Sequence, residues 1–101
     1  PLAPGELPHP RTWQRHHAAA AELLTDVRTA IRQRAEEIRV PQELLLTPGC
    51  QRRLAWDLGE EIEAGRTGRV TAQEIGERLA AMGARPWQIE QTAPALATAL
   101  S

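Results

Sequence analysis

The positions of the eight prolines constrain this chain of 101 residues more than any other feature. Proline fixes φ and lacks a backbone N–H, so it is poorly tolerated inside a helix or a central strand. Four prolines fall within the first ten residues, which predicts an extended linker over residues 1–14 and a domain over residues 15–101. Trp13 is a large apolar residue at this boundary, and we expect it to fold back onto the domain.

The segment between the prolines at positions 10 and 41 has the pattern of a long amphipathic helix. Apolar residues recur every three or four positions, at Leu24, Val27, Ile31, Ala35 and Ile38. This spacing places them on one side of an α-helix, and no glycine or proline interrupts it. The sequence therefore predicts a helix over 16–38. It should end before position 41, because the residue preceding a proline avoids the α region.

The middle of the chain predicts a single helical turn over 42–46 and then a second long helix. Thr47 and Pro48 are typical of an N-cap and of a first helical residue. Gly59 is typical of a helix end, so we expect this helix to stop near Leu58. Residues 59–69 hold three glycines and three glutamates, which predicts a loop.

Two further helices are expected in the last third of the chain. Thr71 and Glu74 match a capping box, in which each side chain accepts a hydrogen bond from a backbone N–H of the other residue. The last helix begins at Arg85 and Pro86. Pro94 should kink or split it near residue 92, because an interior proline removes one hydrogen bond. No alternating pattern of β-branched residues predicts a strand, so the fold class is all-α, a bundle of four to five helices.

The charge balance limits how this chain can meet nucleic acid. The chain contains 12 basic residues, all arginine, and 13 acidic ones, for a net charge of −1. This argues against a nucleic-acid clamp held by bulk charge. Three acids lie close together at Glu60, Glu61 and Glu63, and without them the net charge would be +2 instead of −1. Because arginine pairs bidentately with phosphate, the remaining charge is compatible with a weak contact.

We expect no catalytic residue, no metal and no cofactor in this chain. The acidic cluster falls in a predicted loop, whereas metal ligands need rigid supports. His16 and His17 are adjacent, so on a helix they point about 100° apart, which suits a shared ion poorly. The lone Cys50 has no partner for an internal disulfide and no neighbouring histidine to act as its base.

The residues that could contact a nucleic acid are arginines on predicted helix faces. The candidates for nucleic-acid contact are Arg28, Arg32, Arg52, Arg53 and Arg85. Each of them could instead face water or pair with an acid of the same chain. The residues predicted to form the core are Leu54, Trp56 and Trp87.

Three runs of sequence resemble one known family. They are VPQELLLTP at 40–48, RRLAW at 52–56 and GARPWQIE at 83–90. In order and spacing they resemble the C-terminal region of bacterial ribonuclease D-type 3′–5′ exonucleases, a helical domain of the HRDC fold. The Gly49–Cys50 pair and the long segment 59–69 depart from the family pattern.

The resemblance implies a non-catalytic domain of about five helices. It implies weak RNA binding and positioning of RNA, such as tRNA precursors, for an upstream exonuclease domain that holds the catalytic carboxylates. An alternative is a packing domain that docks on the exonuclease domain without touching RNA, and a helix-turn-helix DNA reader around Thr71 fits less well. No stretch approaches the roughly 20 apolar residues that span a membrane, so we expect no membrane partner and a cytoplasmic location. Because the chain begins at Pro1, we expect it to be part of a longer protein.

Overall fold

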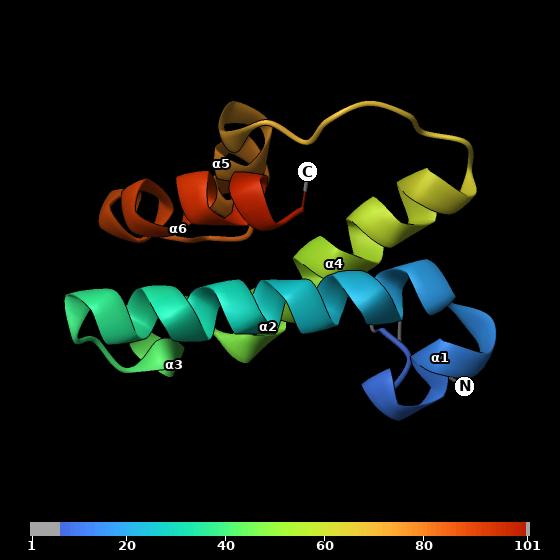
Figure 1. The fold of residues 1–101 in the computed structure, drawn as a ribbon, viewed down its shortest axis with the longest axis horizontal. Helices are drawn as coiled ribbons and strands as arrows, with labels where there is room; N and C mark the ends of the chain where they lie inside the picture. Colours follow the sequence, from blue (N-terminus) through green and yellow to red (C-terminus); the bar gives the residue numbers. More distant parts are fainter. Residues whose placement is uncertain (1–6, 101) are drawn as a thin grey trace.

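The computed structural model of the chain describes residues 7–100, which form six α-helices and one 3₁₀ turn without any strand. The helical elements are η1 (Pro10–Thr12), α1 (Trp13–His16), α2 (Ala18–Ile38), α3 (Gln42–Leu45), α4 (Pro48–Glu63), α5 (Ala72–Ala81) and α6 (Pro86–Ala99). The predicted all-α fold class is therefore confirmed. The helix count exceeds the expectation because the single turn α1 is separate from α2 (Figure 1).

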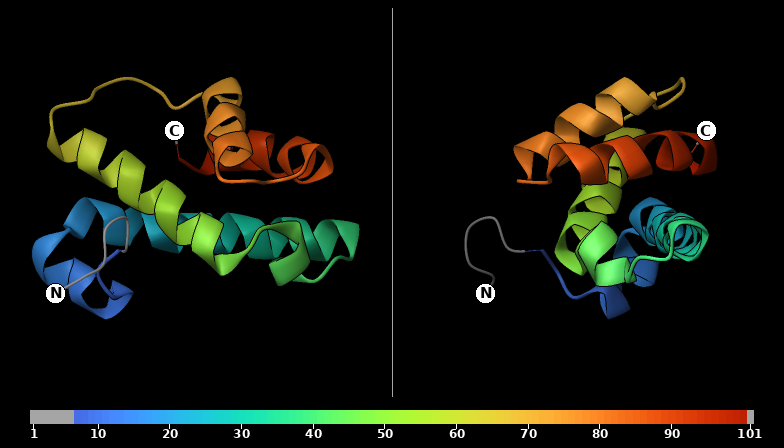
Figure 2. Two further views of the ribbon diagram at one scale, coloured as in Figure 1. Left: turned by 180° about the vertical axis from the view of Figure 1, so that it is seen from behind. Right: turned by 90° about the vertical axis from the view of Figure 1, so that its left-hand side faces the viewer.

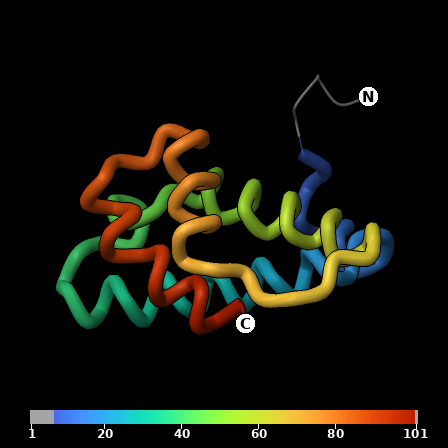
Figure 3. Tube along the Cα trace, turned by 90° about the horizontal axis from the view of Figure 1, so that it is seen from above, coloured from blue at the N-terminus to red at the C-terminus, as the bar shows by residue number. Residues whose placement is uncertain are grey.

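Helix α2 runs along the length of the molecule, and α1, α3, α4 and α6 all contact it. Helix α4 packs against it, and the α5–α6 pair packs against α2 through α6 (Figures 1 and 2). The segment 64–71 runs back from the C-terminal end of α4 toward the middle of the molecule, where α5 begins (Figure 3). Buried apolar side chains of α2, α4, α5 and α6 form one continuous core.

The predicted end of α4 at Gly59 is wrong, because the helix continues to Glu63. Gly59 is buried where α4 crosses α2, and a Cβ built on it would lie 2.7 Å from the Cα and N atoms of Ala20. The glycine thus permits a close approach of two helices instead of ending one. As a consequence, the acidic cluster lies on the last turns of α4 and not in a loop.

The long N-terminal helix begins later than expected. His17 has φ −142° and ψ 58°, so it separates α1 from α2, and the predicted single helix from residue 16 is wrong. Trp13 is fully buried, and its indole N–H donates to the carbonyl oxygen of Pro8 at 2.9 Å. The expectation that Trp13 folds back onto the domain is therefore confirmed. Residues 10–14, which the sequence assigned to the linker, are helical. Residues 1–6 of that linker lie outside the described residues.

Helix α6 is continuous through Pro94, so the predicted split near Thr92 does not occur. Proline at position 94 removes the N–H that would bond to the carbonyl of Glu90. Both residues are exposed, so water can hydrogen-bond to that carbonyl in place of the missing N–H.

One predicted core residue is not in the core. Leu54 is fully buried as expected, and Trp56 is half-buried against the core. Trp87, in contrast, keeps 43% of its surface exposed. It lies nine residues before the buried Leu96, which on a helix of 3.6 residues per turn is the opposite face.

Candidate nucleic-acid interface

Three of the five candidate arginines line one pocket at the N-terminal end of α4. Arg28 comes from α2, whereas Arg52 and Arg53 come from α4. Together with His9 and Gly49 they surround a volume of about 760 Å³. We call this the arginine pocket; its remaining wall is the chain at residues 7, 8 and 10 that enters the domain.

The arginine pocket is positively charged. Within residues 7–100, neither Arg28 nor Arg52 takes part in an ion pair with a carboxylate. Arg53 Nη1 lies 3.6 Å from Asp57 Oδ1, one turn along α4. The planar guanidinium groups suit phosphate oxygens, which they bind with two parallel hydrogen bonds.

The first turn of α4 adds to the positive potential of this pocket. Thr47 Oγ1 accepts a hydrogen bond from the backbone N–H of Cys50 at 3.2 Å, so the predicted N-cap is confirmed. Gly49 lies between them, where a backbone N–H has no acceptor within the helix. The aligned peptide dipoles leave partial positive charge at this end, which favours an anion.

The other two candidate arginines do not line the arginine pocket. Arg32 is exposed on α2, one turn after Arg28. Arg85 is exposed and precedes α6, where its backbone N–H donates to Gln88 Oε1 at 2.7 Å. Their part in nucleic-acid contact stays a prediction.

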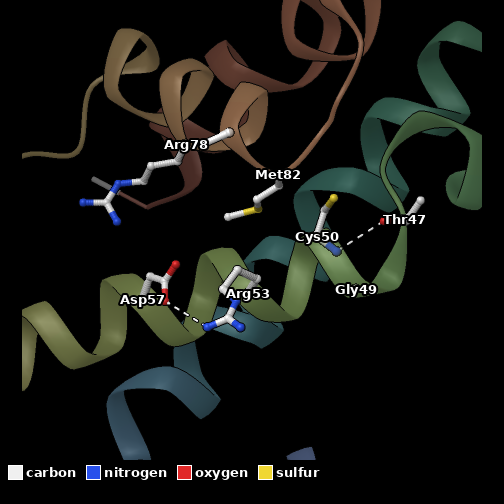
Figure 4. Close-up of a pocket in the computed structure, with 8 residues that line it drawn as sticks. Thr47, Gly49, Cys50, Arg53, Asp57, Arg78 and Met82 are labelled. Carbon is white, nitrogen blue, oxygen red and sulfur yellow. Dashed lines mark hydrogen bonds and ion pairs between the residues drawn. The ribbon is translucent and has the colours of Figure 1, made fainter. Parts of the chain in front are cut away.

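A second groove adjoins the arginine pocket between α4 and α5 (Figure 4). It is an open groove with a volume of about 650 Å³, and it shares Gly49 and Arg53 with the arginine pocket. The other residues that line this groove, here called the α4–α5 groove, are Thr47, Cys50, Asp57, Arg78, Ala81 and Met82.

Four charged side chains connect α4, the following segment and α5. Arg66 lies 2.7 Å from Glu61 and 2.6 Å from Glu74, and Arg78 lies 2.8 Å from Glu74 and also pairs with Glu61. Hydrogen bonds from Arg66 and then Arg78 lower the pKa of Glu74 to about 2 against the opposing effect of desolvation. For Glu61, burial raises the pKa, but hydrogen bonds from the same two arginines outweigh burial and lower it. We call these four residues the ion-pair cluster.

The ion-pair cluster also explains why the predicted capping box is half formed. Thr71 Oγ1 accepts from the backbone N–H of Glu74 at 3.1 Å, as expected for the N-cap. The Glu74 carboxylate, however, accepts from the two arginines of the cluster. Hydrogen bonds from a charged guanidinium are stronger than one from a neutral backbone N–H. The Glu74 carboxylate therefore pairs with the arginines and not with the backbone N–H of Thr71.

The structure also brings together three residues that sequence spacing did not connect. His17, Glu60 and Glu63 offer ligand atoms that lie within 4.8 Å of one another, so they could hold a metal ion. His17 Nδ1 is buried and 3.6 Å from Glu60 Oε1, and the imidazole packs on Trp56 with ring centroids 4.3 Å apart. These residues meet because α4 continues past Gly59 beside the start of α2. The expectation that the chain holds no metal stays a prediction.

Fold and pocket together define a small all-α domain with an arginine-lined surface. Its sequence matches, over residues 6–100, the family model described as the 3′ to 5′ exonuclease C-terminal domain. The chain therefore belongs to this family, and the resemblance seen in the sequence is confirmed at that level. Comparison with curated proteins and with solved structures gave no match. Among residues 7–100, no helix is long and apolar enough to cross a membrane.

Proposed function

We propose that this domain binds RNA weakly through the arginine pocket and positions it for the exonuclease domain of the same protein. The observation that carries the proposal is the convergence of Arg28, Arg52 and Arg53 from two helices on one pocket. In this interpretation the domain is the non-catalytic, HRDC-like part of a ribonuclease D-type exoribonuclease. Such a domain would position tRNA precursors for the exonuclease domain in the cytoplasm.

Physical considerations favour an auxiliary role over strong autonomous binding. The net charge of −1 provides no long-range attraction for RNA, and a single pocket reaches few phosphates. The exonuclease domain would then hold the substrate end, and this domain would add a second, weaker contact. Two linked weak contacts bind more tightly than either one alone.

A salt titration with fluorescently labelled tRNA tests this proposal. The double variant Arg28→Gln/Arg52→Gln should weaken binding and reduce the slope of log affinity against log salt by about 0.7–0.9 for each phosphate that no longer pairs with an arginine. The matched control is Arg15→Gln/Arg39→Gln, which removes the same charge from exposed positions outside the pocket. An equal decrease in affinity in both double variants, or no binding of the unchanged domain at low salt, contradicts the proposal.

A second candidate function is packing against the exonuclease domain. Leu44 and Trp87 are 60% and 43% exposed, and Gln88 Nε2 donates to Leu44 O at 2.8 Å, which brings α3 beside the start of α6. Two large exposed apolar side chains at this junction suit a protein partner. If deletion of the domain destabilises the exonuclease but leaves its preference among RNAs unchanged, the packing function is favoured.

A further inference from the structure

We propose that the α4–α5 groove accommodates one unpaired nucleobase of the RNA strand whose phosphate lies in the arginine pocket. This inference rests on the proposed function and extends it, because it names the kind of strand that is bound. Single-stranded segments would be bound more tightly than fully paired ones.

The two cavities adjoin each other at the first turns of α4, where they share lining residues. Gly49 lines both of them, and it has no side chain of its own that could lie between them. Arg53 also lines both. A phosphate near Arg28 and Arg52 would therefore have its own nucleoside within reach of the groove.

The lining of the groove has the chemistry that a nucleobase needs. Cys50 and Met82 are half-buried and place sulfur atoms in the groove, and Figure 4 shows both side chains between α4 and α5. Polarisable sulfur makes favourable contacts with aromatic rings. The ring edge would meet charged residues, since Asp57 and Arg78 line the same groove. Its volume of about 650 Å³ is within the range of small-molecule sites, about 300–1,000 Å³.

The position of Arg78 in the wall of the groove is fixed by other residues of the chain. Its guanidinium is held by Glu61 and Glu74 of the ion-pair cluster. A paired base presents its hydrogen-bonding edge to its partner strand, so the groove would take a base only after it had left the helix stack. This requirement favours unpaired strands.

The test compares a short single-stranded RNA with an abasic strand of equal length and with the matching duplex. The intact strand should bind about fivefold more tightly than the abasic one, a difference at the low end of measured stacking contributions. The variant Ala81→Leu fills the groove without changing charge and should remove this difference. Its control is Ala80→Leu, also exposed on α5 but outside the groove, which should preserve it.

The single cysteine gives a second measurement on the unchanged protein. Cys50 lines the groove, so the intact strand should slow its reaction with a thiol reagent, whereas the abasic strand should not. Equal affinity for intact and abasic strands without protection of Cys50 overturns the inference. If the intact and abasic strands bind equally but Arg28→Gln/Arg52→Gln weakens the binding of both, the groove inference is wrong and the proposed function is kept. Failure of every strand to bind at low salt overturns both.

Discussion

Gly59 determines how closely the two longest helices approach each other. Its missing side chain is replaced by the backbone of Ala20, and a helix backbone cannot move aside as a flexible side chain can. We expect Gly59→Ala to lower the free energy of unfolding by about 1–3 kcal/mol through overpacking. Urea denaturation measures this change. The control is Gly49→Ala, where a Cβ meets nothing within 4 Å, and there we expect a slight gain of about 0.5–1 kcal/mol.

The three tryptophans should differ in their contributions to stability. Trp13 is fully buried, and its ring centroid lies 5.3 Å from that of the half-buried Trp56. Trp13→Ala should cost about 3–5 kcal/mol and Trp56→Ala less, because part of its surface already meets water. Trp87→Ala should change stability by no more than about 0.5 kcal/mol. Thermal melts of the three variants check this order, and a large destabilisation by Trp87→Ala would place that residue in the core after all.

At the scale of the elements, local signals predicted the helices well and their packing poorly. Thr47 and Thr71 identified two helix starts because capping depends on residues only three positions apart. The prediction that α4 ends at Gly59 is wrong because a glycine that ends a helix and one that permits a close helix crossing look alike in sequence. The arginine pocket depends on how α2 and α4 cross, so periodicity could identify its exposed arginines but could not group them.

The ion-pair cluster makes the attachment of α5 to α4 sensitive to acid. The Glu74 pKa of about 2 in the folded chain is below its ordinary value of 4.5, so this carboxylate stabilises the fold fully above pH 4.5. The contribution disappears as the pH falls from 4.5 toward 2, and the lowered pKa of Glu61 acts in the same direction.

We therefore expect the urea midpoint to fall between pH 5 and pH 3, and Glu74→Gln to reduce this pH dependence. The matched control is Glu77→Gln, an exposed residue on the same helix, which should keep it. An unchanged pH dependence in the Glu74→Gln variant would show that the cluster does not contribute to acid sensitivity.

At the scale of the whole molecule, the arginine pocket and the exposed pair Leu44 and Trp87 involve different helices. The pocket lies between α2, the start of α4 and the entering chain, whereas the exposed pair lies at the junction of α3 and α6. The proposed RNA contact and the proposed protein contact would therefore use different surfaces of the domain. The two candidate functions are separable for this reason.

The double variant Leu44→Ser/Trp87→Ser tests the second surface. Because both side chains are exposed, the melting temperature of the domain alone should stay nearly unchanged. In the complete exonuclease, the same double variant should lower the melting temperature if this surface docks on the exonuclease domain. Equal melting temperatures of the complete enzyme with and without the two changes would exclude that contact.

The burial of Trp13 also has a mechanical consequence. The indole N–H of the buried Trp13 donates a hydrogen bond to the carbonyl oxygen of Pro8. The same stretch of chain forms one wall of the arginine pocket. The stretch of chain that enters the domain is therefore part of the pocket itself. A shift of the entering chain at residues 7–10 would therefore change the shape of the pocket directly, without any movement of α2 or α4.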